Sequence, residues 1–269
     1  MPLPCLVLQN LSRDFGGIKA VDNVTLTIHS GERRALIGPN GAGKTTLFNL
    51  ISGELRATAG RIMFFGVDVT ELAPYRRAAR GIARTFQITR LFPNLTVQEN
   101  VLLACEGLDR RKFTMYRPLS SYADLVQKAA NLLGEFGLSR LRQELARNIS
   151  YGDQRKVEVA LSMAGRPRLL LLDEPMAGLS SAESDSMQAL LRKLDPTIAV
   201  LLIEHDMDVA FGFAEKVTVL SQGRVVMEGH KDEVRANRMV QEIYLGAGSG
   251  SGLQATDFWP EARRLEPEA

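Results

Sequence analysis

The chain has 269 residues, which is enough to bury a substantial core in one large domain or in a domain with a subdomain. Its 33 basic and 31 acidic residues give a net charge of +2, and this slight excess does not predict binding to nucleic acid. The two cysteines, Cys5 and Cys105, match no metal-ligand spacing and suit a reducing, cytosolic environment. The longest apolar runs are strand-sized and the first ten residues lack a secretory signal, so we expect a chain that does not cross the membrane unaided.

The first third of the sequence is predicted to form short strands. Turn residues separate strands between positions 5 and 65, including one at 24–28 and one at 33–37. A glycine-rich loop then precedes an apolar helix from about 44 to 52. From Thr96 to about Ala164 the pattern becomes helical, and the capping box Thr96-Val97-Gln98-Glu99 opens the first helix. The polar segment 107–121 is expected to be a loop between two helices.

Strands and helices alternate again from Arg168 onward. The continuous apolar run LLLLD at 169–173 predicts a buried strand, 182–194 a helix, and 199–203 another buried strand. This alternation predicts a parallel sheet with helices on both faces. A terminal hairpin at 217–228 and a closing helix at 232–244 follow, and residues 246–269 have the composition of a flexible linker and tail.

The strongest local motif is GPNGAGKT at residues 38–45, which matches the phosphate-loop pattern between a strand and a helix. Its glycines let the backbone curl so that several N–H groups face one anion, and the helix N-terminus adds positive partial charge. Lys44 is predicted to reach the outer phosphates and Thr45 to bind Mg2+. The alternative is an ordinary glycine-rich turn. The candidate nucleotide-binding residues here are Gly38, Pro39, Asn40, Gly41, Ala42, Gly43, Lys44, Thr45 and Thr46.

A second motif supplies carboxylates. Asp173 ends the LLLLD strand and is placed to hold Mg2+, directly or through water, and Glu174 comes next to orient and deprotonate an attacking water. Taken alone, an Asp-Glu pair after a strand is as readily the solvated start of a loop. A third segment, ISYGDQR at 149–155, precedes a helix predicted at 156–163. Ser150 and Gly152 there could offer a hydroxyl and N–H groups to phosphate oxygens, although a helix cap is the commoner role for such a serine.

These motifs occur in a characteristic order that resembles the ABC ATPase superfamily over residues 5 to 245. The series is Phe15, the phosphate loop, Gln87 in ARTFQ, the signature at Ser150, the Asp-Glu pair, GLSSAE at 178–183 and His205. The resemblance implies an α/β phosphate-loop NTPase core with a mainly parallel sheet, an N-terminal antiparallel β subdomain and a helical subdomain at about 92–165 that carries the signature. The ATPase domain would span 1–245 and the flexible tail 246–269.

The resemblance also implies roles for single residues. Phe15 would stack on adenine, Gln87 would sense the γ-phosphate through Mg2+ or water, and His205 would hydrogen-bond the γ-phosphate. Glu174, His205 and Gln87 are then the catalytic residues, and Thr45, Gln87 and Asp173 the metal-binding ones. Without the ordered series, Phe15 would be interpreted as a core aromatic residue, Gln87 as an exposed polar residue and His205 as a helix-start residue.

Within the superfamily, ARTFQ, RLFPNLTVQENV, IEHDM and the terminal YLG are similar to LivG-type ATPases of branched-chain amino acid importers. This implies ATP and Mg2+ as cofactors, and as partners a second ATPase subunit, two membrane permeases and a solute-binding protein, at the cytoplasmic face of the inner membrane. A lipopolysaccharide-type exporter ATPase and a soluble non-transport ABC ATPase are the alternatives. Tyr151 stands where the usual signature, LSGGQ, has a glycine, and Asp153 stands where it has the glutamine. Ser180-Ser181 stand where Asn-Pro is common. The solute, and whether the partner ATPase is identical, stay open.

Overall fold

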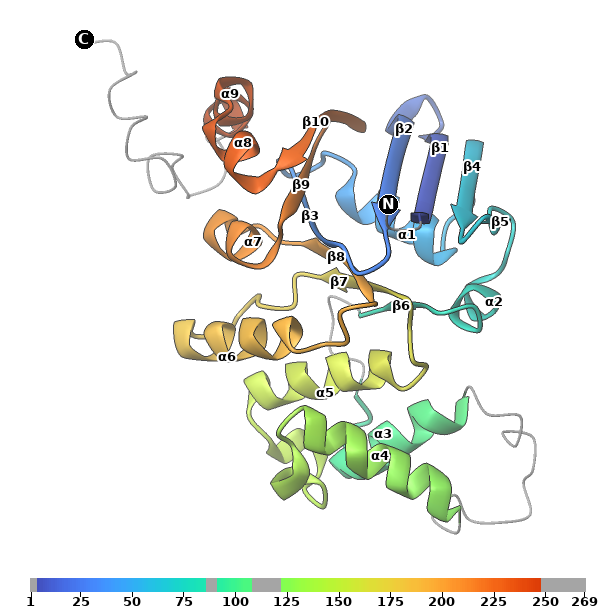
Figure 1. Cartoon of the computed structure of the whole chain (residues 1–269), viewed down its shortest axis with the longest axis vertical. Coiled ribbons are helices and arrows are strands. Elements are labelled where there is room, and N and C mark those ends of the chain that lie inside the picture. Colours follow the sequence, from blue (N-terminus) through green and yellow to red (C-terminus); the bar gives the residue numbers. More distant parts are fainter. Residues whose placement is uncertain (1–3, 86–90, 108–121, 248–269) are drawn as a thin grey trace. The chain divides into compact units, whose positions relative to one another are not determined.

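The computed structural model describes residues 4–85, 91–107 and 122–247, and for 245–247 it describes the backbone alone. The chain divides into two compact units, one made of residues 1–72 and 199–269 and the other of residues 73–198. The first unit is therefore built from both ends of the sequence and the second from its middle (Figure 1).

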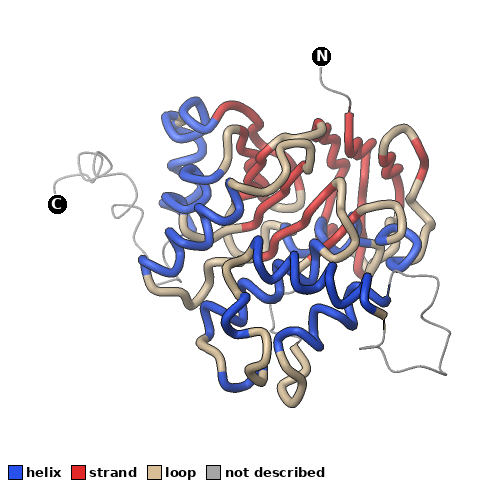
Figure 2. Tube along the Cα trace, turned by 60° about the horizontal axis from the view of Figure 1, so that its bottom comes forward, coloured by secondary structure: helices blue, strands red, loops and turns tan. Residues whose placement is uncertain are grey.

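An antiparallel sheet of the first unit comprises β1 (Pro4–Phe15), β2 (Ile18–His29), β4 (Ala59–Phe64) and β5 (Val67–Asp68). These strands run in the order β2-β1-β4-β5 (Figure 1). Figure 2 shows the strands of the chain in red. Leu6, Leu8 and Leu11 of β1 are buried. The predicted short strand at 24–28 is part of the 12-residue β2, because shifts in register let β1 and β2 stay paired along their whole length.

The first unit also contains parallel strands that pair around β3. β3 (Arg33–Ile37) lies between β8 (Ala199–Ile203) and β9 (Lys216–Ser221) and runs parallel to both. β10 (Arg224–His230) pairs antiparallel with β9 and forms the predicted terminal hairpin. Every residue of β8 is buried, as its continuous apolar sequence predicts.

The helices of the first unit are α1 (Lys44–Ser52), α7 (Met207–Phe213), α8 (Lys231–Ala236) and α9 (Arg238–Ala247). The prediction of one closing helix at 232–244 was wrong, because the chain breaks at Asn237. The Asn237 side chain accepts hydrogen bonds from the N–H groups of Met239 (2.9 Å) and Val240 (3.3 Å) and so starts α9. α9 continues to Ala247, two residues into the segment predicted as a linker.

The second unit is mainly helical. Its elements are α2 (Pro74–Ala78), β6 (Ile82–Arg84), α3 (Val97–Gly107), α4 (Ala123–Glu135), the 3-10 turns η3 (Ser139–Leu141) and η4 (Ala146–Asn148), α5 (Tyr151–Met163), β7 (Leu169–Asp173) and α6 (Ser181–Arg192). β6 pairs parallel with the fully buried β7. The capping box predicted at Thr96 is present, with Thr96 and Glu99 exchanging backbone-to-side-chain hydrogen bonds of 2.7 and 3.1 Å.

Two helix boundaries of this unit differ from the prediction. α5 begins at Tyr151 instead of Lys156, because Ser150 caps it directly, and α6 spans 181–192 instead of 182–194, because Ser180 caps it. Most of the loop predicted at 107–121 and most of the tail lie outside the described residues. The α/β fold class, with an N-terminal antiparallel sheet, mostly parallel strands and added helices, is confirmed.

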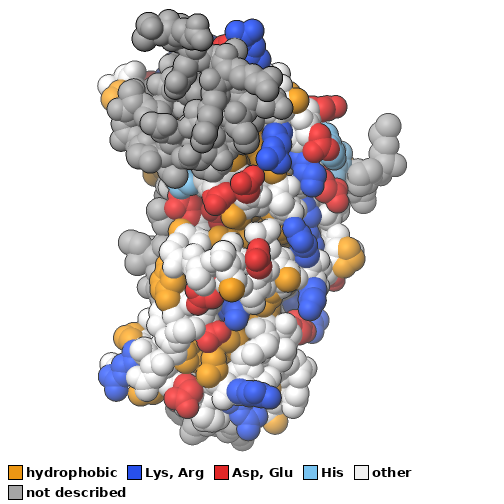
Figure 3. Space-filling view, turned by 90° about the vertical axis from the view of Figure 1, so that its left-hand side faces the viewer, with side chains coloured by type: hydrophobic (Ala, Val, Ile, Leu, Met, Phe, Trp, Pro, Cys, Tyr) orange, Lys and Arg blue, Asp and Glu red, His pale blue; other side chains and the backbone are white. Residues whose placement is uncertain are grey.

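On the face drawn in Figure 3, the described Lys and Arg side chains are interspersed with those of Asp and Glu. No helix within the described ranges is both long enough and apolar enough to cross a bilayer.

Candidate functional site

The phosphate-loop motif of the first unit connects the end of β3 to the start of α1, as predicted. Gly38 (φ 153°) and Gly43 (φ 101°) adopt backbone angles that side chains disfavour. A Cβ atom at either position would also lie well under 3.0 Å from a backbone carbonyl oxygen, that of Leu220 for Gly38 and that of Ala20 for Gly43. Glycine is therefore required at both positions for the loop to pass so close to its neighbours.

Lys44 is held over this loop. Only 6% of the residue is exposed, and its Nζ donates hydrogen bonds to the carbonyl oxygens of Gly38 (2.6 Å) and Pro39 (3.0 Å). Gly43 caps α1 without a side chain, so nothing from the cap residue covers the first N–H groups of the helix. Thr45 is exposed and Thr46 half-buried. A fixed ammonium group next to a helix N-terminus is an arrangement that binds phosphate.

Tyr244 of α9 also contacts this loop, which the sequence did not predict. Its hydroxyl accepts a hydrogen bond from the backbone N–H of Gly38, and burial raises the pKa of Tyr244 well above its ordinary value. The only signal was the YLG ending, which gives no indication that the tyrosine returns to a loop about 200 residues earlier in the chain.

Phe15 and His205, the other predicted residues of this unit, are both exposed at strand ends. Phe15 ends β1 with 44% of its surface exposed, and the guanidinium of Arg13 stacks 4.5 Å from its ring centre. His205 follows β8 just before Asp206, whose carboxylate caps α7. Neither residue belongs to the core, which removes the alternative interpretation of Phe15.

In the second unit, β7 ends at Asp173, and Glu174 follows directly after it. Asp173 is 2% exposed; its carboxylate Oδ2 accepts a hydrogen bond from Nη2 of Arg84 at 3.0 Å, and its backbone N–H donates to the Thr85 hydroxyl at 3.3 Å. Glu174 has a φ of 49°, a left-handed conformation that is uncommon for a residue with a side chain. Five other described residues with side chains share this conformation, so the angle does not by itself separate the functional interpretation of Glu174 from a solvated loop start.

Ser150 caps α5 in the signature segment. Its hydroxyl accepts the N–H of Asp153 at 3.1 Å and donates to the Asp153 carboxylate at 2.9 Å, and Lys156 pairs with the same carboxylate at 3.1 Å. Ser150 is thus both a helix cap and an exposed hydroxyl at a helix N-terminus. The added negative charge of Asp153 is partly neutralised within its own helix turn.

Gly152 brings this segment close to the start of α6. A Cβ atom at Gly152 would lie 2.5 Å from Oε1 of Glu183, the residue that completes the capping box with Ser180. Hydrogen bonds from the Ser180 hydroxyl and backbone N–H lower the pKa of Glu183. The signature segment and the 178–183 segment, predicted as separate motifs, therefore lie against one another.

Comparison with known proteins agrees with this arrangement. The ABC transporter family model matches residues 21–177, and the branched-chain amino acid transport ATP-binding protein BraF of Pseudomonas aeruginosa is 37% identical over 91% of this chain and 99% of that protein. The chain belongs to the ABC transporter ATP-binding family. LivG of Escherichia coli K12 matches with the same identity and coverage, and LivG of Archaeoglobus fulgidus is 37% identical over 90% of this chain and 95% of that protein.

Solved structures of ABC ATP-binding cassettes share the fold. The ADP conformation of MJ1267 superposes with a TM-score of 0.81 at 31% identity, covering 90% of this chain and 99% of that one. A dimeric post-hydrolysis state of the MJ0796 cassette, bound to ADP and Pi, gives a TM-score of 0.72 at 28% identity, covering 84% and 98%. This chain is accordingly an ATP-binding, ATP-hydrolysing transporter subunit from a family whose cassettes form dimers.

Tyr151 gives this ABC cassette a contact that a glycine at the same position cannot make. Its hydroxyl donates to the carbonyl oxygen of Ala177 at 3.3 Å, and its ring lies 3.1 Å from the point that a Cβ on Gly178 would occupy. Arg155 stacks on the ring at 5.1 Å and pairs with Glu158 at 3.0 Å. Tyr151 thus fastens the signature to the segment that follows the Asp-Glu pair.

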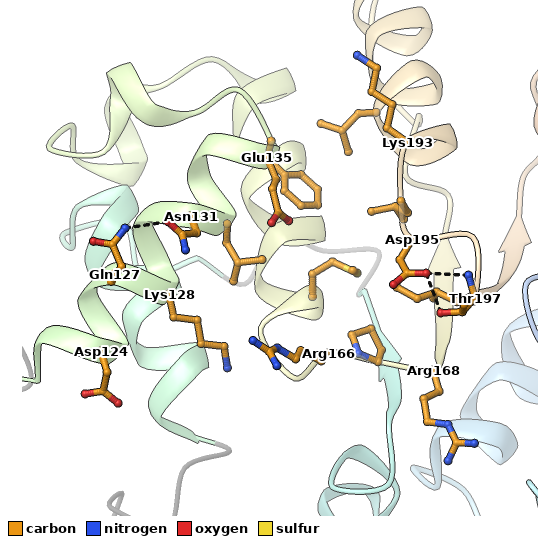
Figure 4. A pocket seen from close by; sticks show the side chains of 17 residues that line it. Asp124, Gln127, Lys128, Asn131, Glu135, Arg166, Arg168, Lys193, Asp195 and Thr197 are labelled. Carbon is orange, nitrogen blue, oxygen red and sulfur yellow. Dashed lines mark hydrogen bonds between the residues drawn. The ribbon is translucent and has the colours of Figure 1, made fainter.

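A groove of about 1190 Å³ lies elsewhere in the second unit, between α4 and the ends of α5 and α6 (Figure 4). Lys128 and Arg166 point toward one another across it. None of the predicted site residues lines this groove. Gln87 lies outside the described residues, and the individual roles predicted for the site residues stay predictions.

Proposed function

We propose that this chain hydrolyses ATP to power the uptake of branched-chain amino acids or related small solutes. The proposal rests chiefly on the near full-length match to BraF and LivG, which covers 99% of BraF. The phosphate loop, with its two positions restricted to glycine and its buried Lys44, supports the ATP-binding part of the proposal. Uptake of labelled leucine into vesicles that contain this chain together with branched-chain amino acid permeases and their binding protein tests it. If ATP is hydrolysed normally but no branched-chain amino acid is transported, this choice of solute is ruled out.

The residues of the first unit would hold the nucleotide. Phe15 presents an exposed ring for adenine, the loop from Gly38 to Thr46 surrounds the phosphates, and Lys44 contacts the outer ones. His205 would hydrogen-bond the γ-phosphate. Lys44→Ala should abolish ATP binding measured by titration calorimetry, because the ammonium group is the fixed positive charge of the loop.

Magnesium would be bound mainly through the nucleotide. The described residues contain no group of three or more His, Cys, Asp or Glu side chains that could hold a metal ion. A single buried carboxylate at Asp173 and a hydroxyl at Thr45 suit Mg2+, which is commonly bound through one or two carboxylates together with substrate phosphates. When bound, the ion would neutralise charge on the phosphate oxygens. Gln87 remains a third proposed ligand.

Glu174 is the proposed general base. Its side chain would accept the proton of the water that attacks the γ-phosphate. Glu174→Gln keeps the shape of the side chain but removes its basicity, so we expect ATP binding close to that of the wild type with turnover lower by roughly a hundredfold or more. Near-normal phosphate release by the variant would refute the assignment.

Membrane partners complete the proposal. The chain would act at the cytoplasmic face of the inner membrane with a second ATPase subunit, identical or different, which contributes its own Ser150-type signature to each nucleotide. Two permeases, with a solute-binding protein acting through them, would contact residues 84–100, of which 86–90 lie outside the described residues. A cysteine at Leu91 should crosslink to a permease, whereas a cysteine at the exposed Asp232 serves as the matched control. Crosslinking through the control alone would contradict this docking surface.

A further inference from the structure

The carboxylate proposed to serve magnesium already has a cationic partner within its own unit. Nη2 of Arg84 donates to Oδ2 of Asp173 at 3.0 Å. The Arg84 side chain is 8% exposed and that of Asp173 is 2% exposed, so the pair is shielded from water on both sides. A buried ion pair of this kind attracts strongly, and removing one partner leaves the other charge without its compensation.

The backbone fixes this pair in place. β6 runs parallel to β7 with Arg84 opposite Leu171, and the N–H of Thr85 donates to the carbonyl oxygen of Leu171 at 2.9 Å. The Thr85 hydroxyl in turn accepts the backbone N–H of Asp173. Three hydrogen bonds therefore tie the end of β6 to the end of β7, and they hold the backbone of Arg84 beside that of Asp173.

The surroundings of the pair are closely packed. A small gap between Thr85, Asp173 and the neighbouring Arg155–Glu158 pair is too small to admit a water molecule. The Arg155 and Glu158 charges are paired with one another at 3.0 Å.

We propose that Arg84 is the resident counter-ion of Asp173 and keeps this carboxylate from taking up a divalent cation that is not carried by ATP. The proposal rests on the proposed function, in which Asp173 serves the magnesium of MgATP. A carboxylate that already shares an oxygen with a guanidinium is a poor ligand for a free hydrated cation, because the guanidinium repels the cation. Nucleotide phosphates add the negative charge and ligands that the site lacks. The metal would thus enter with the nucleotide and not before it.

The experiment measures Mn2+ binding by electron paramagnetic resonance, with Mn2+ as the probe for Mg2+, on the full chain with and without ATP. In the absence of ATP, Arg84→Met should bind Mn2+ roughly tenfold or more tightly than the wild type. Arg84→Gln, which keeps a hydrogen-bond donor but not the charge, should behave in the same way. Adding Asp173→Asn to Arg84→Met should remove the gain, which identifies the carboxylate as the site.

Arg80→Met is the matched control, because Arg80 is an exposed arginine of the same unit that donates only to a backbone carbonyl, at 3.4 Å. It should leave Mn2+ binding unchanged. If folded Arg84→Met and Arg84→Gln bind Mn2+ without ATP within twofold of the wild type, the inference is wrong. If Arg84→Met is unfolded in metal-free buffer, millimolar Mn2+ should restore its melting transition, and failure to do so likewise contradicts the inference. Absence of ATP-dependent Mn2+ binding in the wild type would instead refute the proposed function.

Discussion

Two glycines of the phosphate loop allow the origin of its stability to be tested by a matched pair of substitutions. Gly41 and Gly43 both have left-handed φ angles, 77° and 101°. A Cβ at Gly41 would meet nothing within 4 Å, whereas a Cβ at Gly43 would meet the backbone carbonyl of Ala20 in β2 and lie 3.5 Å from Cα of Gly223. The two alanine substitutions therefore share the backbone cost and differ only in the clash.

The expected free energies follow from this difference. A left-handed conformation costs a residue with a side chain roughly 1–2 kcal/mol, so Gly41→Ala should lower the free energy of unfolding by about that amount. Gly43→Ala adds overpacking against a strand that is paired along its whole length, which costs about 1–3 kcal/mol more, so its total should be about 2–5 kcal/mol. Urea unfolding of both variants without nucleotide measures this difference. Equal destabilisation by the two substitutions would refute the reasoning, because the close approach to Ala20 would then have no energetic weight.

Two further predictions concern contacts that the sequence did not indicate. Burial raises the pKa of Tyr244 above its ordinary value of 10.0, so the folded chain keeps this proton at a pH where the unfolded chain has lost it. The free energy of unfolding should therefore fall by up to about 1.4 kcal/mol per pH unit above pH 10. In urea titrations at pH 9 and 11, Tyr244→Phe should remove the part of this fall that Tyr244 causes. Gly178→Ala should lower the free energy of unfolding, both because Gly178 has a φ of 78° and because the new Cβ would approach the Tyr151 ring. In a double-mutant cycle, adding Tyr151→Ala should recover about 0.5–1 kcal/mol of this free energy. A coupling energy of zero would mean that the ring does not restrict this position.

The elements that the sequence predicted well are those with a strong local signal. The apolar runs of β7 and β8 are fully buried strands because no polar residue interrupts them, and the capping box at Thr96 formed because its two partners are three residues apart. The pKa of Glu99 is lowered by hydrogen bonds from the Thr96 backbone and hydroxyl, as such a box requires.

The helix boundaries were less predictable. Ser150 could be interpreted as part of a loop or as a cap, and only the hydrogen bond from the Asp153 N–H decides that α5 begins directly after it. The break at Asn237 has a similar cause, because an asparagine side chain competes with the helix for backbone N–H groups. The predicted domain boundary at 245 and the helical subdomain at 92–165 stay predictions; the compact second unit covers 73–198.

The sequence predicted which strands and loops carry the candidate site residues, but it did not predict which residues they contact. The strand ends identified Asp173 and Glu174, yet the left-handed backbone of Glu174 has no sequence signal, because residues with side chains seldom adopt it. The pairing of Asp173 with Arg84 joins residues 89 positions apart, and the contact of Tyr244 with Gly38 joins α9 to the phosphate loop. A single sequence carries no information on such long-range pairs.

The division of the chain has a consequence for how it is made. β3 needs β8 and β9 as neighbours, but the ribosome delivers them only after roughly 160 more residues, about ten to thirty seconds later at ordinary rates of synthesis. The middle unit is continuous in sequence and can collapse during that delay, while the nascent β3 still exposes Leu36 and Ile37. The apolar side chains of β3 therefore stay without both strand neighbours until residue 221 has left the exit tunnel, so the N-terminal segment is the part of the nascent chain most exposed to aggregation.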